Sequence, residues 1–162
     1  MKLTEGHIHV SMRRFLKNND WKLIAGEYPG GSDDELYALN VVNPKVARDN
    51  SPDPRRHSKD EMIPDLIAYK DGILLIIEAK PGYSDDDRDK LIDLLTTRLD
   101  DFYSALEIFI AERNITGLPS LSSLKLAPCL AFSATTRKFL HDEGFYHIRV
   151  KDLNEATLEG PF

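Results

Sequence analysis

The chain has 162 residues, enough for one domain (1–162) with a substantial core, and its composition of 41% hydrophobic and 30% charged residues is that of an ordinary globular protein. No apolar run is long enough to span a bilayer and the first residues lack the apolar core of a signal peptide, so we expect a cytoplasmic protein. The net charge of −6 argues against a non-specific nucleic-acid coat protein but is compatible with a local basic groove.

Residues 4–18 are predicted to form a helix that is capped by Thr4 and has one apolar side. Three basic residues of this helix are expected to face solvent: Arg13, Arg14 and Lys17. Glu5 lies in the first turn, where a carboxylate stabilises the positive end of the helix dipole. His7 and His9 are two residues apart and point in different directions, so we expect exposed or capping roles for them rather than a metal site.

Residues 21–27 are predicted to form the first strand, and a further short strand is expected over 36–42. Glu27, at the end of the first strand, is either a solvated residue or an outer-sphere partner of a metal site. An excursion at about 43–62 carries the densest basic cluster of the chain. Its candidate DNA-binding residues are Arg48, Arg55, Arg56 and Lys59. Such side chains bind phosphates, so this segment is either a DNA-contacting loop or a solvated charged loop.

Residues 63–80 are predicted to form a β-hairpin around an Asp-Gly turn at 71–72, because a two-residue turn of this type needs positive φ at both positions. The register that this turn sets places Asp65 directly opposite Glu78. Lys80 lies on the same face as Glu78 by the two-residue period of a strand. Three ionisable groups therefore gather at the end of an otherwise apolar hairpin.

Two facing carboxylates repel each other, and a divalent cation between them would relieve the repulsion. Hard oxygen ligands suit Mg²⁺, whose remaining coordination positions are filled by water and a substrate phosphate. Lys80 would then lie beside the attacking water or the developing charge. The hairpin end is thus a candidate site for metal-dependent hydrolysis.

The same residues carry a family resemblance. A proline followed by Asp65, twelve intervening residues and then Glu78-Ala79-Lys80 resembles the signature of the PD-(D/E)xK nuclease superfamily, which includes many restriction endonucleases and Holliday-junction resolvases. The resemblance implies that Asp65, Glu78 and the carbonyl of Ala79 bind Mg²⁺, for which Mn²⁺ can substitute, and that Lys80 orients or activates water. It also implies that an acid on the first helix, here Glu5, can approach the metal.

A long helix is predicted from about residue 85 to Arg113, opened by an acidic first turn. Its apolar stripe favours a place in the core, although pairing with a second chain is an alternative. Lys90 and Arg98 on this helix could reach a substrate phosphate.

The remaining elements are a loop, a buried strand, a short helix and a last strand. We expect the strand over 124–132, with Cys129 as a buried core thiol, and the helix between Thr135 or Thr136 and Gly144. The last strand is expected over 145–150. The tail, residues 151–162, has weak patterning and is expected to be loosely held.

This element order resembles the core of the same superfamily: an α/β fold with a central mixed sheet of four to five strands flanked by helices. The chain contains no glutamine, so it lacks the Gln-x-x-x-Tyr element common in exonuclease-type relatives, and it is less basic than Holliday-junction resolvases. The resemblance therefore implies a Mg²⁺-dependent endonuclease of double-stranded DNA, restriction-type or the catalytic subunit of one. Cutting both strands implies a homodimer or a partner subunit. The alternatives are a non-catalytic DNA-binding or assembly subunit with the same fold, and a nuclease for RNA or branched DNA.

Overall fold

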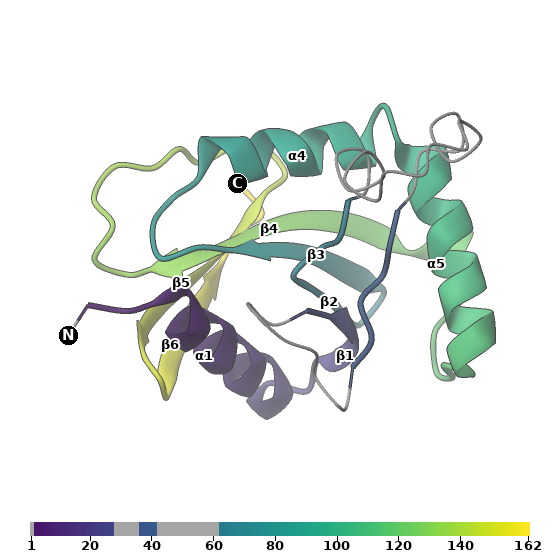
Figure 1. Cartoon of the computed structure of the whole chain (residues 1–162), viewed down its shortest axis with the longest axis horizontal. Coiled ribbons are helices and arrows are strands. Elements are labelled where there is room, and N and C mark those ends of the chain that lie inside the picture. Colours follow the sequence, from purple (N-terminus) through teal and green to yellow (C-terminus); the bar gives the residue numbers. More distant parts are fainter. Residues whose placement is uncertain (1, 28–35, 42–61) are drawn as a thin grey trace, which may run out of the picture.

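The computed structural model describes residues 2–27, 36–41 and 62–162. Within these ranges the chain forms a six-stranded sheet, with α1 on one face and α4 and α5 on the other (Figure 1). The strands are β1 (Lys22–Gly26), β2 (Leu66–Lys70), β3 (Ile73–Ala79), β4 (Lys125–Ser133), β5 (Tyr146–Asp152) and β6 (Glu155–Glu159). The helices are α1 (Glu5–Asn18), α4 (Asp85–Leu95), α5 (Leu99–Arg113) and the single 3₁₀ turn η1 (Leu121–Ser123). The expected mixed α/β sheet is confirmed, with more strands than predicted.

The strands lie in chain order across the sheet, from β1 to β6. The three central strands, β3, β4 and β5, are parallel, whereas β1, β2 and β6 are antiparallel to their neighbours. The carboxyl ends of β3, β4 and β5 therefore meet at the same end of the sheet as the start of β2. In Figure 1 this end lies at the left, where α1 begins and the loop from β3 leads to α4.

The β2–β3 hairpin has the predicted turn and register. Asp71 and Gly72 have φ values of 49° and 82°, the positive values that a two-residue hairpin turn requires. Leu66 pairs with Ile77 at the other end of the ladder. One more step of this register would bring the preceding residue, Asp65, opposite Glu78.

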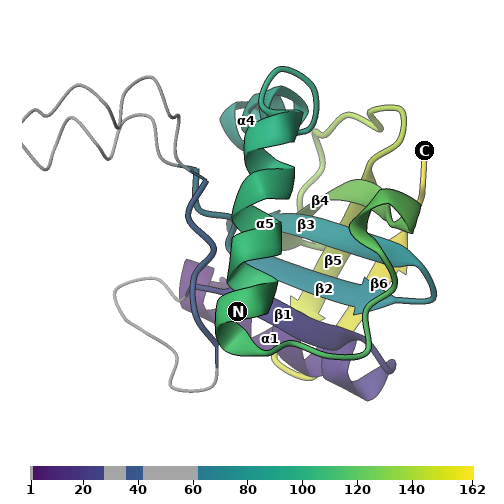
Figure 2. The ribbon, with the colours of Figure 1, turned by 90° about the vertical axis from the view of Figure 1, so that its right-hand side faces the viewer.

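The apolar run of β3 is buried because helices cover both faces of the sheet. Leu75 and Ile77 belong to the cluster that includes α1, whereas Leu74 and Ile76 belong to the cluster that includes α4 and α5. Figure 2 shows α5 packed over this second face. Cys129, on β4, is fully buried, which confirms the expected core thiol, and burial raises the pKa of its thiol.

The prediction of one long helix up to Arg113 is wrong, because the helix breaks between α4 and α5. Thr96 has φ −121° and ψ −80°, and its hydroxyl donates a hydrogen bond of 2.6 Å to the carbonyl of Ile92. β-Branched residues with such local bonds are weak helix formers. The apolar stripe is nevertheless buried on both sides of the break, as Leu91 and Phe102 show, so its expected place in the core is confirmed.

The predicted helix before Gly144 is also wrong: turns and irregular backbone occupy 134–144. The N–H of Ala134 donates to the carbonyl of Val150 at 2.7 Å, and the side chain of Arg149 donates to the carbonyl of Ala134 at 2.8 Å. The segment is thus tied to β5 from its first residue.

The tail is not loosely held, because residues 155–159 form β6, antiparallel to β5. Ala156 and Leu158 alternate along β6 and pack against the core cluster that includes α1. Beyond β6, the N–H of Phe162 donates to the carbonyl of Phe145 at 3.1 Å. The alternation of Ala156 and Leu158 was the sequence signal that could have indicated β6.

In place of the strand expected over 36–42, the described residues 36–41 are irregular apart from isolated bridge residues at Leu36 and Val41, of which Val41 pairs with Met62. In the part of the chain that the structure describes, no helix combines the length and the apolar character needed to cross a bilayer.

Candidate metal centre

The first turn of α1 is fixed by reciprocal hydrogen bonds. The hydroxyl of Thr4 accepts from the N–H of His7 at 3.2 Å, and His7 Nδ1 accepts from the N–H of Thr4 at 3.1 Å. This capping box confirms both the cap at Thr4 and the capping role of His7. It orients the turn that carries Glu5 and His9, which share one face because they are four residues apart.

Replacing Thr4 with alanine should lower the free energy of unfolding by about 1 kcal/mol, because the N–H of His7 loses its acceptor. Urea denaturation followed by circular dichroism measures the change. Thr4→Ser, which keeps the hydroxyl, is the matched control and should stay close to the wild-type value. Equal stability of Thr4→Ala and wild type would show that the cap contributes nothing to α1.

His9 is fully buried, with 0% of its surface exposed, so the expected exposed or capping role is wrong for this residue. Burial lowers the pKa of its imidazole, and the charges of Arg13 and Lys80 act in the same direction, against those of Asp65 and Glu5. The lowered pKa keeps the ring neutral at pH 7, the form in which histidine binds metals. The spacing of four residues between Glu5 and His9 was the signal that could have revealed this face of the helix.

Asp65 lies in the bend before β2 and connects α1 with the end of β3. Its Oδ2 accepts a hydrogen bond of 2.8 Å from the N–H of Ala79 and lies 3.9 Å from His9 Nε2. Its backbone carbonyl accepts from the N–H of Glu27 at 3.0 Å. The carboxylate is therefore held at the point where β1, β2, β3 and α1 come together.

Glu5, His9 and Asp65 form a convergent set of potential metal ligands. One ligand atom from each residue lies within 4.8 Å of the other two. Glu5 and Asp65 were predicted at this site, whereas His9 was not. We refer to these three residues as the ligand cluster.

Glu78 lies beside Asp65 but is bound to a lysine of α4. The Glu78 side chain is 4% exposed, and its Oε1 is 2.6 Å from Lys90 Nζ. Burial raises the pKa of Glu78 well above its usual range and the charge of Asp65 raises it further, whereas Lys90 lowers it. The electrostatic effect of Asp65 on Glu78 agrees with the cross-strand neighbourhood that the hairpin predicts.

Lys80, directly after β3, reaches the ligand cluster from another side. Its Nζ lies 3.7 Å from Glu5 Oε1, and its side chain is 46% exposed. Partial burial lowers the pKa of Lys80, but the surrounding carboxylates, Asp87 and Glu5 foremost, outweigh it and raise the pKa overall. Lys80 is therefore an ammonium ion at neutral pH, suited to orienting water or stabilising negative charge rather than to accepting a proton.

Asp87 is a further acid near the site. The sequence indicated only that Asp87 belongs to the acidic first turn of the helix that is now α4. It is half-buried on α4, and burial raises the pKa of its carboxyl, whereas Lys80 and Lys90 lower it. Its proximity depends on how α4 packs on β3, so no sequence spacing indicates it.

Other predicted residues lie elsewhere or beyond the described ranges. The predicted DNA-binding residues, Arg48, Arg55, Arg56 and Lys59, lie outside the described residues. Arg98 donates to the carbonyl of Val41 at 3.3 Å and lies 3.7 Å from Asp101, so it is engaged next to α5.

Arg13 is buried, contrary to the expectation that it faces solvent, and a Cβ atom at Gly26 would lie 2.8 Å from its Nη2. Glu27 is exposed and is not part of the ligand cluster.

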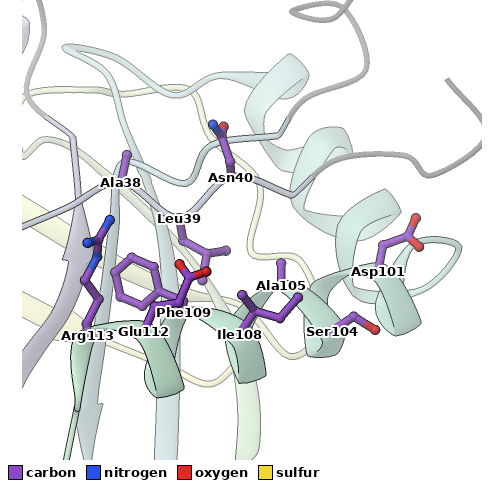
Figure 3. Close-up of a pocket in the computed structure, with 10 residues that line it drawn as sticks. All are labelled: Ala38, Leu39, Asn40, Asp101, Ser104, Ala105, Ile108, Phe109, Glu112 and Arg113. Atoms are coloured by element: carbon purple, nitrogen blue, oxygen red, sulfur yellow. The ribbon is translucent and has the colours of Figure 1, made fainter. Parts of the chain in front are cut away.

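A separate cavity of about 500 Å³ lies between α5 and residues 38–40 (Figure 3). Leu39 and Ile108 line it, and acidic and basic side chains, Asp101 and Arg113 among them, stand around it. None of the ligand cluster contributes to its wall. The cavity and the candidate metal centre are thus different places on the molecule.

No family model, curated protein or solved structure matches this chain. Its function is therefore inferred from the geometry at the end of the hairpin.

Proposed function

We propose that this protein is a metal-dependent endonuclease of the PD-(D/E)xK type that hydrolyses phosphodiester bonds of double-stranded DNA. The observation that carries the proposal is the convergence of Glu5, His9 and Asp65 beside Lys80 at the end of the β2–β3 hairpin. The site thus brings two carboxylates, an imidazole and an ammonium ion together from three separate segments of the chain.

The ligand cluster fits a divalent cation. The two carboxylate oxygens suit either Mg²⁺ or Mn²⁺. The neutral imidazole nitrogen favours Mn²⁺, because nitrogen ligands bind transition metals more readily than they bind Mg²⁺. Glu78 and the carbonyl of Ala79, the further ligands that the resemblance implies, belong to the adjacent end of β3. A bound cation would polarise a phosphoryl oxygen and lower the pKa of a water molecule.

The protein's own residues would position these partners. The N–H of Ala79 fixes Asp65, and the capped first turn of α1 fixes Glu5. Lys80 stays protonated among the acids and can donate to the attacking water or to the phosphate oxygens, where negative charge grows in the transition state. His9 stays neutral and can offer a nitrogen without adding positive charge.

DNA binding would draw on the basic excursion around residues 48–59, whose side chains can contact backbone phosphates. One hairpin supplies one catalytic site, so cutting both strands would require a second copy of this chain or a partner subunit.

The alternative is a non-catalytic DNA-binding or assembly subunit. It is favoured by the contacts that the hairpin acids already make: Lys90 neutralises Glu78, and the N–H of Ala79 satisfies Asp65. In such a protein the acids would be structural, and no cation would be needed.

Incubation with supercoiled plasmid DNA in Mg²⁺ or Mn²⁺, with an EDTA control, tests the proposal. We expect metal-dependent cleavage that EDTA abolishes; discrete fragments would indicate a sequence-specific enzyme. Parallel reactions on RNA and on branched DNA identify the preferred substrate. Plasmid that stays intact in both metals, at protein concentrations where it is bound, would support the non-catalytic alternative.

A further inference from the structure

We propose that Lys90 is a second phosphate-binding cation of this site, an inference that rests on the proposed nuclease function. In the free protein Lys90 neutralises Glu78. When a divalent cation binds at the hairpin end, the ammonium group of Lys90 turns to a phosphate of the DNA backbone.

The geometry places Lys90 between a buried acid and solvent. Its Nζ is 2.6 Å from Glu78 Oε1, and its side chain is 33% exposed whereas that of Glu78 is 4% exposed. The lysine approaches from α4, the layer opposite α1. Lys90 is thus the solvent-facing partner of this pair, and its flexible stem allows the ammonium to move.

The charges explain why Lys90 would change partners. A buried carboxylate without a counter-charge is unfavourable, so Lys90 stabilises the charge of Glu78 as long as no other cation is present. A divalent cation at the ligand cluster, next to Glu78, supplies positive charge there and repels the ammonium. The nearest anion for Lys90 is then the phosphate backbone of a bound substrate.

Lys90 is also the cation of α4 best placed for this contact. Arg88, on the same helix, is engaged with Asp89 at 2.9 Å and Asp85 at 3.4 Å. Lys80, directly after β3, contacts Glu5 of α1, and Lys90, on α4, contacts Glu78 of β3. The two lysines therefore flank the acids, an arrangement that can hold a phosphate backbone from two directions.

The salt dependence of DNA binding separates a phosphate contact from a purely structural ion pair. Binding to a short DNA duplex is measured in Ca²⁺, a divalent cation that takes carboxylate oxygen ligands, over a series of salt concentrations. A lost phosphate contact makes the negative slope of log K against log[salt] shallower, so that its magnitude decreases by about 0.9. We expect this decrease for Lys90→Met and a wild-type slope for Lys90→Arg.

Lys125→Met is the matched control, since this exposed lysine begins β4 at the opposite end of the sheet, and it should keep the wild-type slope. Should Lys90→Met not fold, the comparison is made between Glu78→Gln and Glu78→Gln/Lys90→Met, in which no buried carboxylate is left unpaired. A wild-type slope without Lys90 overturns this inference and leaves the nuclease proposal standing. Absence of salt-dependent DNA binding by the wild-type protein overturns both.

Discussion

Replacing Lys80 with alanine is expected to lower the rate of DNA cleavage by at least about a hundredfold, while folding and metal binding are retained. The ammonium group lies 3.7 Å from Glu5, and the surrounding acids keep it protonated, so its loss removes a positive charge from the place where negative charge develops. The side chain is nearly half exposed, so stability should change by less than about 1 kcal/mol. Single-turnover cleavage, Mn²⁺ titration and thermal unfolding measure the three quantities.

Lys125→Ala removes an exposed lysine from the far end of the same sheet and serves as the control; its cleavage rate should equal that of the wild type. An unchanged cleavage rate in Lys80→Ala would remove Lys80 from the catalytic site.

Replacing Asp65 with asparagine is expected to weaken metal binding by more than about a hundredfold and to abolish cleavage. Losing a group that only supports a metal ligand already costs 10–100-fold in affinity or activity, and Asp65 would be a direct ligand. The amide oxygen of asparagine can still accept the N–H of Ala79, so the change removes the charge and keeps the shape. Isothermal titration with Mn²⁺ measures the affinity.

Asp71→Asn, in the turn of the same hairpin, is the matched control, because asparagine tolerates the positive φ of 49° at that position. It should bind Mn²⁺ as the wild type does. Equal Mn²⁺ affinity of Asp65→Asn and wild type would exclude Asp65 as a ligand.

The hairpin was predictable because its determinants are local. The Asp-Gly turn at 71–72 sets the register, and the register carries Asp65 toward Glu78 without any knowledge of the remaining fold. The cap of α1 at Thr4 follows from local chemistry in the same way.

The ligand cluster could be predicted only in part, because it is assembled by packing between layers. Whether His9 turns toward solvent or toward Asp65 depends on which face of α1 lies on the sheet. The contact of Lys90 with Glu78 depends on where α4 crosses the end of β3. The four-residue spacing of Glu5 and His9 shows that they share a face of α1 but not which face meets the sheet, and the contact of Lys90 with Glu78 corresponds to no spacing along the chain.

The two mispredicted elements have different causes. The stripe of apolar residues keeps its helical spacing on both sides of Thr96, so it indicated a single helix, although the backbone breaks at Thr96. Conversely, β6 is short and polar, and it is a strand because β5 offers it an edge. A local hydrogen bond of Thr96 accompanies the break, whereas the tertiary pairing with β5 decided β6.

Anomalous diffraction from crystals soaked in Mn²⁺ tests the central claim most directly, because it locates the cation without depending on activity. The account predicts a manganese peak within bonding distance of Glu5, His9 and Asp65, at the end of β3 and beside Lys80. Well-diffracting soaked crystals with no manganese among these three residues would contradict it and would favour the non-catalytic alternative.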